Sequence, residues 1–214
     1  MPGSRSREGL MRQRTLAEIR RRLIHGHWPP DTVLQEQTLA DELQVSKTPV
    51  REALQTLSVQ NLVKPVPRLG YVVSAIDLDD LIEVFEFRIL LEGEMVATLA
   101  SRGTVLGEAG DTSPDTIQEH ELVFHQGIGR LGGGPRMRHT LDNLVEESSR
   151  AMHYYRFSDQ VLGELVGDHH AILAAIETRD VVLARSLITI HLTRIRESLM
   201  ANLRQRLRDQ NLLA

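Results

Sequence analysis

The spacing of apolar residues predicts both helices and strands within the first third of this 214-residue chain. Apolar residues three and four positions apart predict helices over residues 15–25 and 39–43, and over a stretch that begins at Thr48. A short strand is expected at Val33–Leu34. The order of these elements is typical of a helix-turn-helix, with residues 44–47 as its turn.

An alternating segment follows this helix pair. Residues 63–66 read Val-Lys-Pro-Val, residues 67–70 contain a glycine, and residues 71–73 are again apolar or aromatic. This pattern predicts a two-stranded hairpin with a Gly-containing turn. Helix, turn, helix and hairpin together predict a winged helix-turn-helix over residues 15–74.

The rest of the chain has helical periodicity and no strand signal. Asp77 is expected to cap a long helix, and residues 103–114 form a loop rich in Gly, Asp and Ser. The predicted helices cover residues 78–101, 114–130, 135–157, 159–178 and 180–208. The fold class is therefore mainly α, a winged helix-turn-helix followed by an all-α bundle over residues 78–208. The remaining segments are read as a disordered arm over residues 1–14, a linker over 75–77 and a tail over 209–214.

The helix that begins at Thr48 has two contrasting faces. Thr48 is its expected N-cap and Pro49 its first residue, where the missing N–H costs nothing. One face is apolar, and the opposite face carries Thr48, Arg51, Gln55 and Ser58, all of which can donate to phosphates or base edges. This face predicts contact with double-stranded DNA.

Charge supports the prediction of a DNA-binding segment. The formal net charge is −4, but residues 1–76 hold 11 Lys and Arg against 7 Asp and Glu, a net of +4. The remaining 138 residues hold 14 against 22, a net of −8. A basic segment joined to an acidic one suits a DNA reader with a separate sensing domain. Zero cysteines exclude thiol catalysis, and the lack of a long apolar run or signal peptide predicts a cytoplasmic protein without membrane contact.

Besides Arg88 in the first predicted helix, four polar residues lie within the apolar stripes of the predicted bundle. Glu121 and His125 are one helical turn apart, and His169 and His191 lie in two further helices. Burying three imidazoles and a carboxylate without partners is costly, and such a set suits Zn²⁺, Ni²⁺, Mn²⁺ or Fe²⁺ with positions open for a ligand. A single histidine in such a stripe is more often a hydrogen-bonded core residue than a metal ligand, so the prediction rests on the set of four. The remaining bundle histidines lie off the stripes and are read as surface or outer contacts: His120, His139, His153 and His170.

The first segment resembles the N-terminal domain of the GntR family of bacterial transcription regulators. The matching positions are Leu39-Ala40, Val45-Ser46, Thr48 to Leu54, Leu57, Leu62-Val63 and Gly70. The resemblance implies a homodimer that places two recognition helices in successive major grooves of a palindromic operator. Arg51 and Lys47 would be the main polar contacts, with Ser46, Thr48, Gln37 and Gln55 in support and Arg68-Leu69-Gly70 at the minor groove or backbone.

Three positions depart from the usual GntR pattern. Lys47 stands where Arg is usual, which favours contact with phosphate over bidentate recognition of guanine. Asp31 and Asn61 stand where Gly is usual. Asn is the best replacement where positive φ is needed, so the turn before the hairpin is expected to form.

The second segment resembles the FCD ligand-binding domain of the FadR-type branch of that family. The similarity rests on Arg88-x-x-Leu91-Glu92, Glu121-x-x-Phe124-His125, Asp168-His169 and the segment from Ala184 to His191. It implies that Glu121, His125, His169 and His191 hold a divalent ion and that Arg88 helps to bind a carboxylate effector. Glu121 replaces the usual Asp, and the segment from Arg102 to Glu119 is shorter than usual and read as loop.

The sequence thus predicts a ligand-responsive transcription regulator that acts as a repressor. It does not predict an enzyme. Its cofactor is a divalent metal such as Zn, Ni or Mn, and its effector a small organic acid. Three alternatives stay open. The histidines line a metal-free effector pocket, or the bundle serves only for dimerisation, or the set is a metalloenzyme site. For Arg88, the alternative is an internal ion pair with Glu92, one helical turn away.

Overall fold

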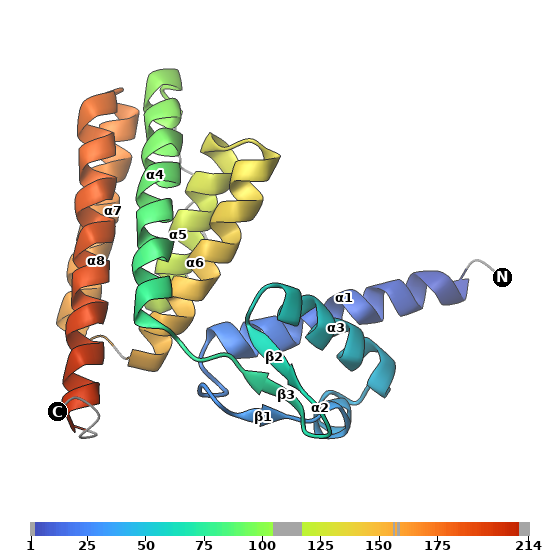
Figure 1. Ribbon diagram of the computed structural model, residues 1–214. Coiled ribbons are helices and arrows are strands. Elements are labelled where there is room, and N and C mark those ends of the chain that lie inside the picture. The colour runs from blue at the N-terminus through green and yellow to red at the C-terminus, as the bar shows by residue number, and fades with distance from the viewer. Residues whose placement is uncertain (1–2, 105–116, 156, 158, 210–214) are drawn as a thin grey trace. The chain divides into compact units, whose positions relative to one another are not determined.

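The structure is a computed structural model that describes residues 3–104, 117–155, 157 and 159–209. The chain divides into two compact units, Met1–Ile76 and Asp77–Ala214. The first contains three helices and a small sheet, and the second contains helices alone among its described residues (Figure 1). The predicted fold class, a winged helix-turn-helix followed by a helical bundle, is confirmed.

The first unit is a winged helix-turn-helix. Its elements are α1 (Gly3–Ile24), β1 (Val33–Leu34), α2 (Glu36–Leu43), α3 (Lys47–Val59), β2 (Val63–Val66) and β3 (Gly70–Val73). The strands form an antiparallel sheet in the order β1-β3-β2. Val50, Leu54 and Leu57 of α3 are fully buried and join Ile19 and Leu23 of α1 in one core. Burial of this apolar stripe fixes α3 with its polar face outward.

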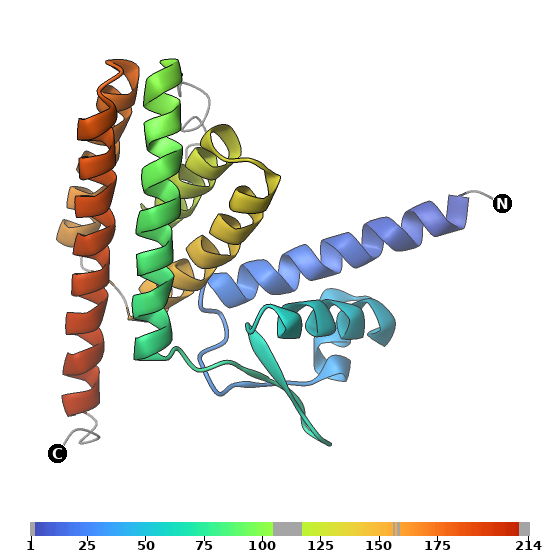
Figure 2. The same cartoon turned by 45° about the horizontal axis from the view of Figure 1, so that its top comes forward.

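Two helices of this unit begin earlier than the sequence predicted. The arm expected to be disordered over residues 1–14 is helical from Gly3, although residues 8–14 are exposed. Its Leu, Met, Arg and Gln residues favour a helix without burial, so the absence of an apolar stripe was misleading. α1 runs beside α3 (Figure 2), and Arg12 forms an ion pair of 3.1 Å with Glu52. α2 likewise begins at Glu36, not at Leu39.

The start of α3 also differs from the prediction. Ser46 occupies the N-cap position with extended backbone, and Lys47 is the first helical residue, so Thr48 is not the cap. Pro49 is consequently the third residue of the helix. It still costs no hydrogen bond, because the first four N–H groups of a helix have no partner within it.

Left-handed backbone occurs at the turns where the sequence departs from glycine. Asp31 has φ 66° and Asn61 has φ 58°. Asp and Asn tolerate this conformation better than other side chains do. The predicted survival of the turn before the wing is confirmed by Asn61, whose N–H donates to Ser58 O at 3.1 Å.

The second unit is a bundle arranged around one central helix. Its helices are α4 (Leu78–Arg102), α5 (Ile117–Gly132), α6 (Pro135–Tyr155), α7 (Asp159–Glu177) and α8 (Val181–Asp209). α4 packs against each of the others, with α5 and α6 on one side and α7 and α8 on the other (Figure 1). Asp77 caps α4 as predicted, because its carboxylate accepts from the N–H groups of Asp79 and Asp80.

The helix bounds of the bundle differ only slightly from the predicted ones. Residues 105–116, which include most of the loop predicted over residues 103–114, lie outside the described residues, and so do residues 210–214 of the predicted tail. Residues 117–119 lie both in the predicted helix over 114–130 and in the segment read as loop, and they belong to α5. Asp209, assigned to the tail, belongs to α8. Among the described residues, no helix is apolar enough over a sufficient length to cross a membrane.

Candidate functional site

The exposed face of α3 presents the side chains predicted to read DNA. Ser46, Lys47, Thr48, Arg51 and Gln55 are all exposed. The first three lie at the N-terminal end of the helix, where the N–H groups without helical partners and the helix dipole favour an anion such as phosphate. Gln37 of α2 is exposed as well, and its amide donates to Asp41 at 2.7 Å.

Arg51 is held in place by a carboxylate that the sequence reading missed. Its Nε lies 3.0 Å from both oxygens of Glu36, and its Nη2 lies 2.8 Å from Oε2. The hydrogen bonds from Arg51 lower the pKa of Glu36 more than burial raises it, so the carboxylate stays ionised. Glu36 belongs to α2, and only the packing of α2 on α3 brings the two together.

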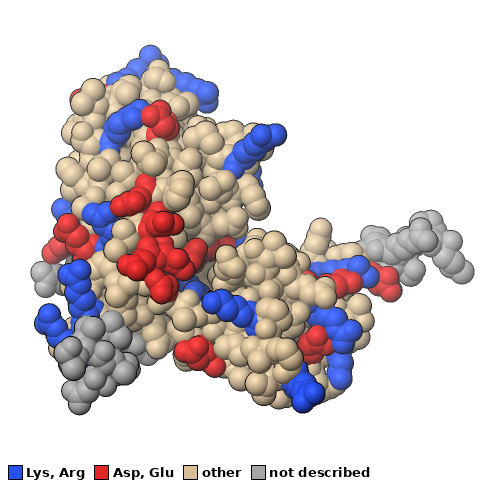
Figure 3. Space-filling view, viewed as in Figure 1, with Lys and Arg blue, Asp and Glu red and all other residues tan. Residues whose placement is uncertain are grey.

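The tip of the wing places two further predicted residues at a tight turn. Arg68 has φ 66° and is exposed, and Gly70 has φ 108°. A Cβ added at Gly70 would lie 2.6 Å from Leu34 O, so the close approach of β1 requires glycine there. The unit therefore carries an exposed polar helix and an exposed wing, as a DNA-reading module needs. Figure 3 shows basic and acidic side chains interspersed over this unit, and acidic ones gathered on part of the bundle.

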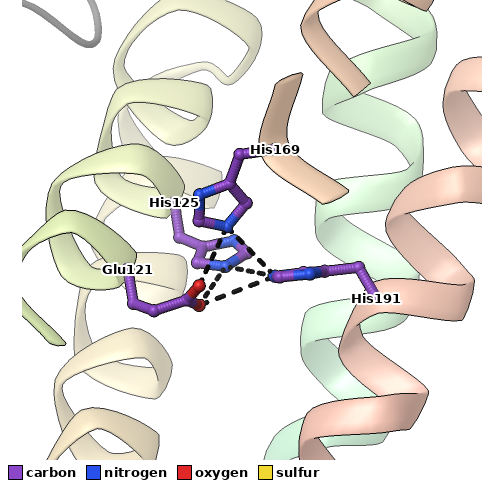
Figure 4. Close-up of side chains that lie close together, drawn as sticks. All are labelled: Glu121, His125, His169 and His191. Atoms are coloured by element: carbon purple, nitrogen blue, oxygen red, sulfur yellow. Dashed lines mark hydrogen bonds and ion pairs between the residues drawn. The ribbon is translucent and has the colours of Figure 1, made fainter. Parts of the chain in front are cut away.

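The three histidines and Glu121 meet inside the bundle. Glu121 and His125 come from α5, His169 from α7 and His191 from α8, and one ligand atom of each lies within 4.8 Å of the others (Figure 4). The Nε2 of His191 lies 3.2 Å from Nε2 of both other histidines. Glu121 approaches His169 Nε2 at 3.1 Å and His125 Nε2 at 3.3 Å. All four side chains are buried.

The opposite ring nitrogen of each histidine has its own partner. His125 Nδ1 contacts Oε2 of Glu92, and His191 Nδ1 lies 3.3 Å from Oδ2 of Asp168. His169 Nδ1 lies 3.2 Å from Nδ1 of His120. Because ionised carboxylates only accept hydrogen bonds, Nδ1 of His125 and of His191 each carry the proton. A neutral imidazole then has a bare lone pair on Nε2.

This distribution of protons fits a cation at the centre. Two bare Nε2 atoms 3.2 Å apart cannot hydrogen-bond to each other, and a carboxylate faces both of them. A metal ion would satisfy all these lone pairs, and carboxylate–histidine pairs of this kind are the usual support for metal ligands. Three nitrogens and a carboxylate oxygen suit Zn²⁺, Ni²⁺ or Mn²⁺.

The ionisation of the cluster agrees with this chemistry. Burial lowers the pKa of His169 to about 4, and the charge of Glu121 offsets this only in part, so this imidazole is neutral at pH 7. Burial raises the pKa of Glu121, but its contacts with the ring nitrogens of His169, His125 and His191 outweigh this and lower the pKa well below 4.5. Neutral imidazole and ionised carboxylate are the forms that bind metal.

Arg88, the predicted effector residue, is buried beside this cluster. Its Nε donates to Oε1 of Glu92 at 2.8 Å, so the ion pair foreseen as an alternative is present. Its Nη1 donates to Oγ of Ser148 at 2.8 Å. Its Nη2 is buried and finds no acceptor among the described residues. A buried N–H without a partner is costly, so this edge of the guanidinium is suited to an acceptor from a ligand.

The outer residues of the site were harder to find in the sequence. Glu92 and Ser148 are buried polar residues in helices other than those of the histidines, and Asp168 is partly exposed. One signal was available, since Glu92 follows Arg88 by one turn and Asp168 precedes His169 directly. Their partners, however, depend on how the helices are rotated against each other.

Comparison with known proteins agrees with both units. Residues 11–73 match the family model of bacterial regulatory proteins of the gntR family, and residues 83–194 match the FCD domain. The chain is 27% identical over 195 residues to the HTH-type transcriptional repressor GlaR of Escherichia coli, covering 79% of this chain and 87% of that protein. It is 25% identical over 188 residues to the gluconate operon transcriptional repressor of Bacillus licheniformis, covering 78% and 76%.

Solved structures share the fold. A putative GntR transcriptional regulator from Rhodococcus sp. RHA1 superposes with a TM-score of 0.74 at 20% identity, and E. coli McbR/YncC with 0.76 at 22%. Each comparison covers 89% of this chain and 97% of the other. The FCD match alone spans more than half of the sequence. The chain therefore belongs to the GntR family, with an FCD domain as its second unit, and it is a transcriptional regulator and not an enzyme.

Proposed function

We propose that this regulator is a repressor that binds a palindromic operator as a homodimer and responds to a small organic acid bound beside a divalent metal. The observation that carries the proposal is the convergence of three Nε2 atoms and the Glu121 carboxylate, with two of the Nδ1 atoms backed by carboxylates. Relatives that are named repressors, of GlaR type and of the gluconate operon, support the sign of the regulation.

The DNA-binding part of the proposal rests on the exposed face of α3. Arg51 and Lys47 would make the main polar contacts in the major groove, with support from Ser46, Thr48, Gln55 and Gln37. Arg68 and Gly70 at the wing tip would lie against the backbone or minor groove. Two copies related by a two-fold axis would read two half-sites about one helical turn apart.

The sensing part rests on the buried site of the bundle. Glu121, His125, His169 and His191 would hold the metal, whose charge attracts a carboxylate, and Arg88 Nη2 would donate to the same ligand. Effector binding would favour one of two states of the dimer that differ in operator affinity, with reciprocal coupling between effector and operator.

The test begins with an operator selected from a randomised duplex library by the full-length protein. We expect a palindromic consensus, and operator affinity that differs between metal-stripped and metal-loaded protein once a pool of small organic acids is added. A consensus without two-fold symmetry would contradict the dimer. Equal response to the acids with and without metal would favour the alternative of a metal-free pocket, in which the histidines only line the effector site.

A further inference from the structure

Two series of hydrogen bonds lead to the histidine cluster, and each runs from an arginine through a carboxylate to a histidine. In the first, Arg88 donates to Glu92, which accepts from His125. In the second, Arg194 donates to Asp168 at 2.8 Å, and the same carboxylate accepts from His191. Each series thus joins an arginine to the Nδ1 atom of a cluster histidine through one carboxylate.

The two series of hydrogen bonds differ in their exposure to water. The side chains of Arg88 and Glu92 are 2% and 0% exposed, whereas those of Arg194 and Asp168 are 42% and 23% exposed. Solvent screens the outer pair and offers its groups replacement hydrogen bonds, but it does neither for the buried pair. A change of charge at Arg88 should therefore alter the electrostatic potential at the cluster, whereas the same change at Arg194 should be screened by water.

We propose that Glu92 is a positioning residue that makes metal binding at the cluster and anion binding at Arg88 strengthen each other. This inference rests on the proposed function, since it assumes that the cluster holds a metal. Glu92 divides one negative charge between its two oxygens, one bonded to Arg88 and the other to His125. It also fixes His125 with its bare Nε2 toward the cluster.

The coupling follows from this division of charge. An anion that neutralises Arg88 leaves more of the negative charge of Glu92 for the Nδ1–H of His125, and a stronger hydrogen bond there makes Nε2 a better metal ligand. By linkage, a bound metal must raise the affinity for the anion by the same factor. Asp168 supports His191 in the same way but has no buried cation to share with a ligand.

Glutamine cannot take over the role of Glu92, although it has the same shape. Both neighbours of the Glu92 carboxylate donate hydrogen bonds, and an amide has one accepting oxygen and one donating NH₂ group. Glu92→Gln must therefore leave either Arg88 or His125 facing a donor. If the NH₂ group faces His125, its ring is driven to the tautomer with the proton on Nε2, which cannot bind metal.

The experiment measures the affinity for Ni²⁺ alone, by competition with a chromophoric chelator, in the full-length protein and in two matched pairs of variants. We expect Glu92→Gln to lower the affinity roughly tenfold or more, and Asp168→Asn to lower it less, as is typical of groups behind metal ligands. Arg88→Gln, which imitates neutralisation by an anion, should raise the affinity about threefold or more. Arg194→Gln should change it by less than about twofold because that charge is screened.

A second measurement does not depend on whether Glu92→Gln folds. The Nδ1–H proton resonances of His125 and His191 are followed by NMR in the Ni²⁺-free, Zn²⁺-loaded protein. Arg88→Gln should move the His125 resonance downfield and leave that of His191 in place. An affinity that is unchanged or lowered by Arg88→Gln, or a His125 resonance that does not move, would overturn the role of Glu92. A wild-type protein that binds no metal would instead refute the metal part of the proposed function.

Discussion

Arg51 carries the predicted recognition of DNA, and in the free protein its guanidinium is bound to Glu36. The side chain of Arg51 is 57% exposed and held by three contacts with one carboxylate. A fixed guanidinium loses less side-chain entropy when it meets a base or a phosphate. Glu36 would therefore orient the side chain proposed to read DNA, at the cost of placing a negative charge near the phosphates.

Replacement of Arg51 should weaken DNA binding and leave the protein folded. Arg51→Ala should weaken operator binding by about 1–3 kcal/mol and reduce discrimination against altered half-sites, since a bidentate base contact is worth about that much. Fluorescence anisotropy with matched and altered duplexes measures both effects. Arg138→Ala, the same change of charge on an exposed residue of α6, is the control and should leave binding unchanged. Full operator affinity in Arg51→Ala would refute the assigned role.

Gly70 tests the geometry of the wing. Alanine at this residue would combine φ 108° with a Cβ 2.6 Å from Leu34 O, so Gly70→Ala should destabilise the first unit by more than about 1 kcal/mol. Gly9→Ala is a matched control, because Gly9 lies in α1 with nothing within 4 Å of its added Cβ. That change should stabilise the helix by about 0.5–1 kcal/mol. Chemical denaturation measures both, and equal effects would contradict the close approach of β1 to the wing.

At the scale of elements, α4 connects the two parts of the proposed effector site, Arg88 and the histidine cluster. It carries Arg88 and Glu92 and contacts every other helix of the bundle, while α5, α7 and α8 supply the cluster. The four proposed metal ligands are thus positioned by three separate helices that pack on α4. Metal binding would tie these helices together, since binding energy at a multi-helix site stabilises the fold.

Binding of metal across these helices should depend on pH through His191. Burial lowers the pKa of this histidine, but hydrogen bonds to Asp168 and Glu121 raise it above 6.5 overall. A proton held above pH 6.5 must leave before Nε2 can bind metal. The affinity for Zn²⁺ should therefore rise as the pH increases from 6 through the pKa of His191, with release of protons on binding.

Calorimetry in two buffers with different ionisation enthalpies measures this release. Asp168→Asn removes one of the groups that raise the pKa, so it should move the pH dependence toward lower pH. Binding whose enthalpy does not depend on the buffer at pH 6.5 would contradict the role of His191 in this pH dependence.

Elements and buried polar residues could be predicted from the sequence to different extents. Arg88, Glu121, His125, His169 and His191 were predictable because each interrupts an apolar stripe, and a polar residue in a stripe must be buried. Glu36, as the partner of Arg51, was not, because that pairing depends on how α2 packs against α3. The helical arm from Gly3 was missed because its propensity is not accompanied by burial. The cap of α3 was misplaced by two residues because Ser46 and Thr48 are equally good candidates.

At the scale of the whole molecule, the chain joins a basic unit to an acidic one. The net charge of +4 on residues 1–76 favours DNA, and the −8 on the remainder disfavours phosphates and favours cations. Binding of a metal and an organic acid in the second unit can influence operator binding by the first unit only if the two units are coupled. The proposed response to such an effector therefore depends on a metal held in the bundle by Glu121 and the three histidines.

The most direct test is the metal content of full-length protein purified without chelators and without a nickel column. We expect about one divalent ion per chain by elemental mass spectrometry, lost in His169→Ala. His170→Ala, a change in the exposed neighbouring histidine, should retain the ion. Protein without metal that also fails to take up Zn²⁺, Ni²⁺ or Mn²⁺, or metal retained in His169→Ala, would contradict the proposed metal site.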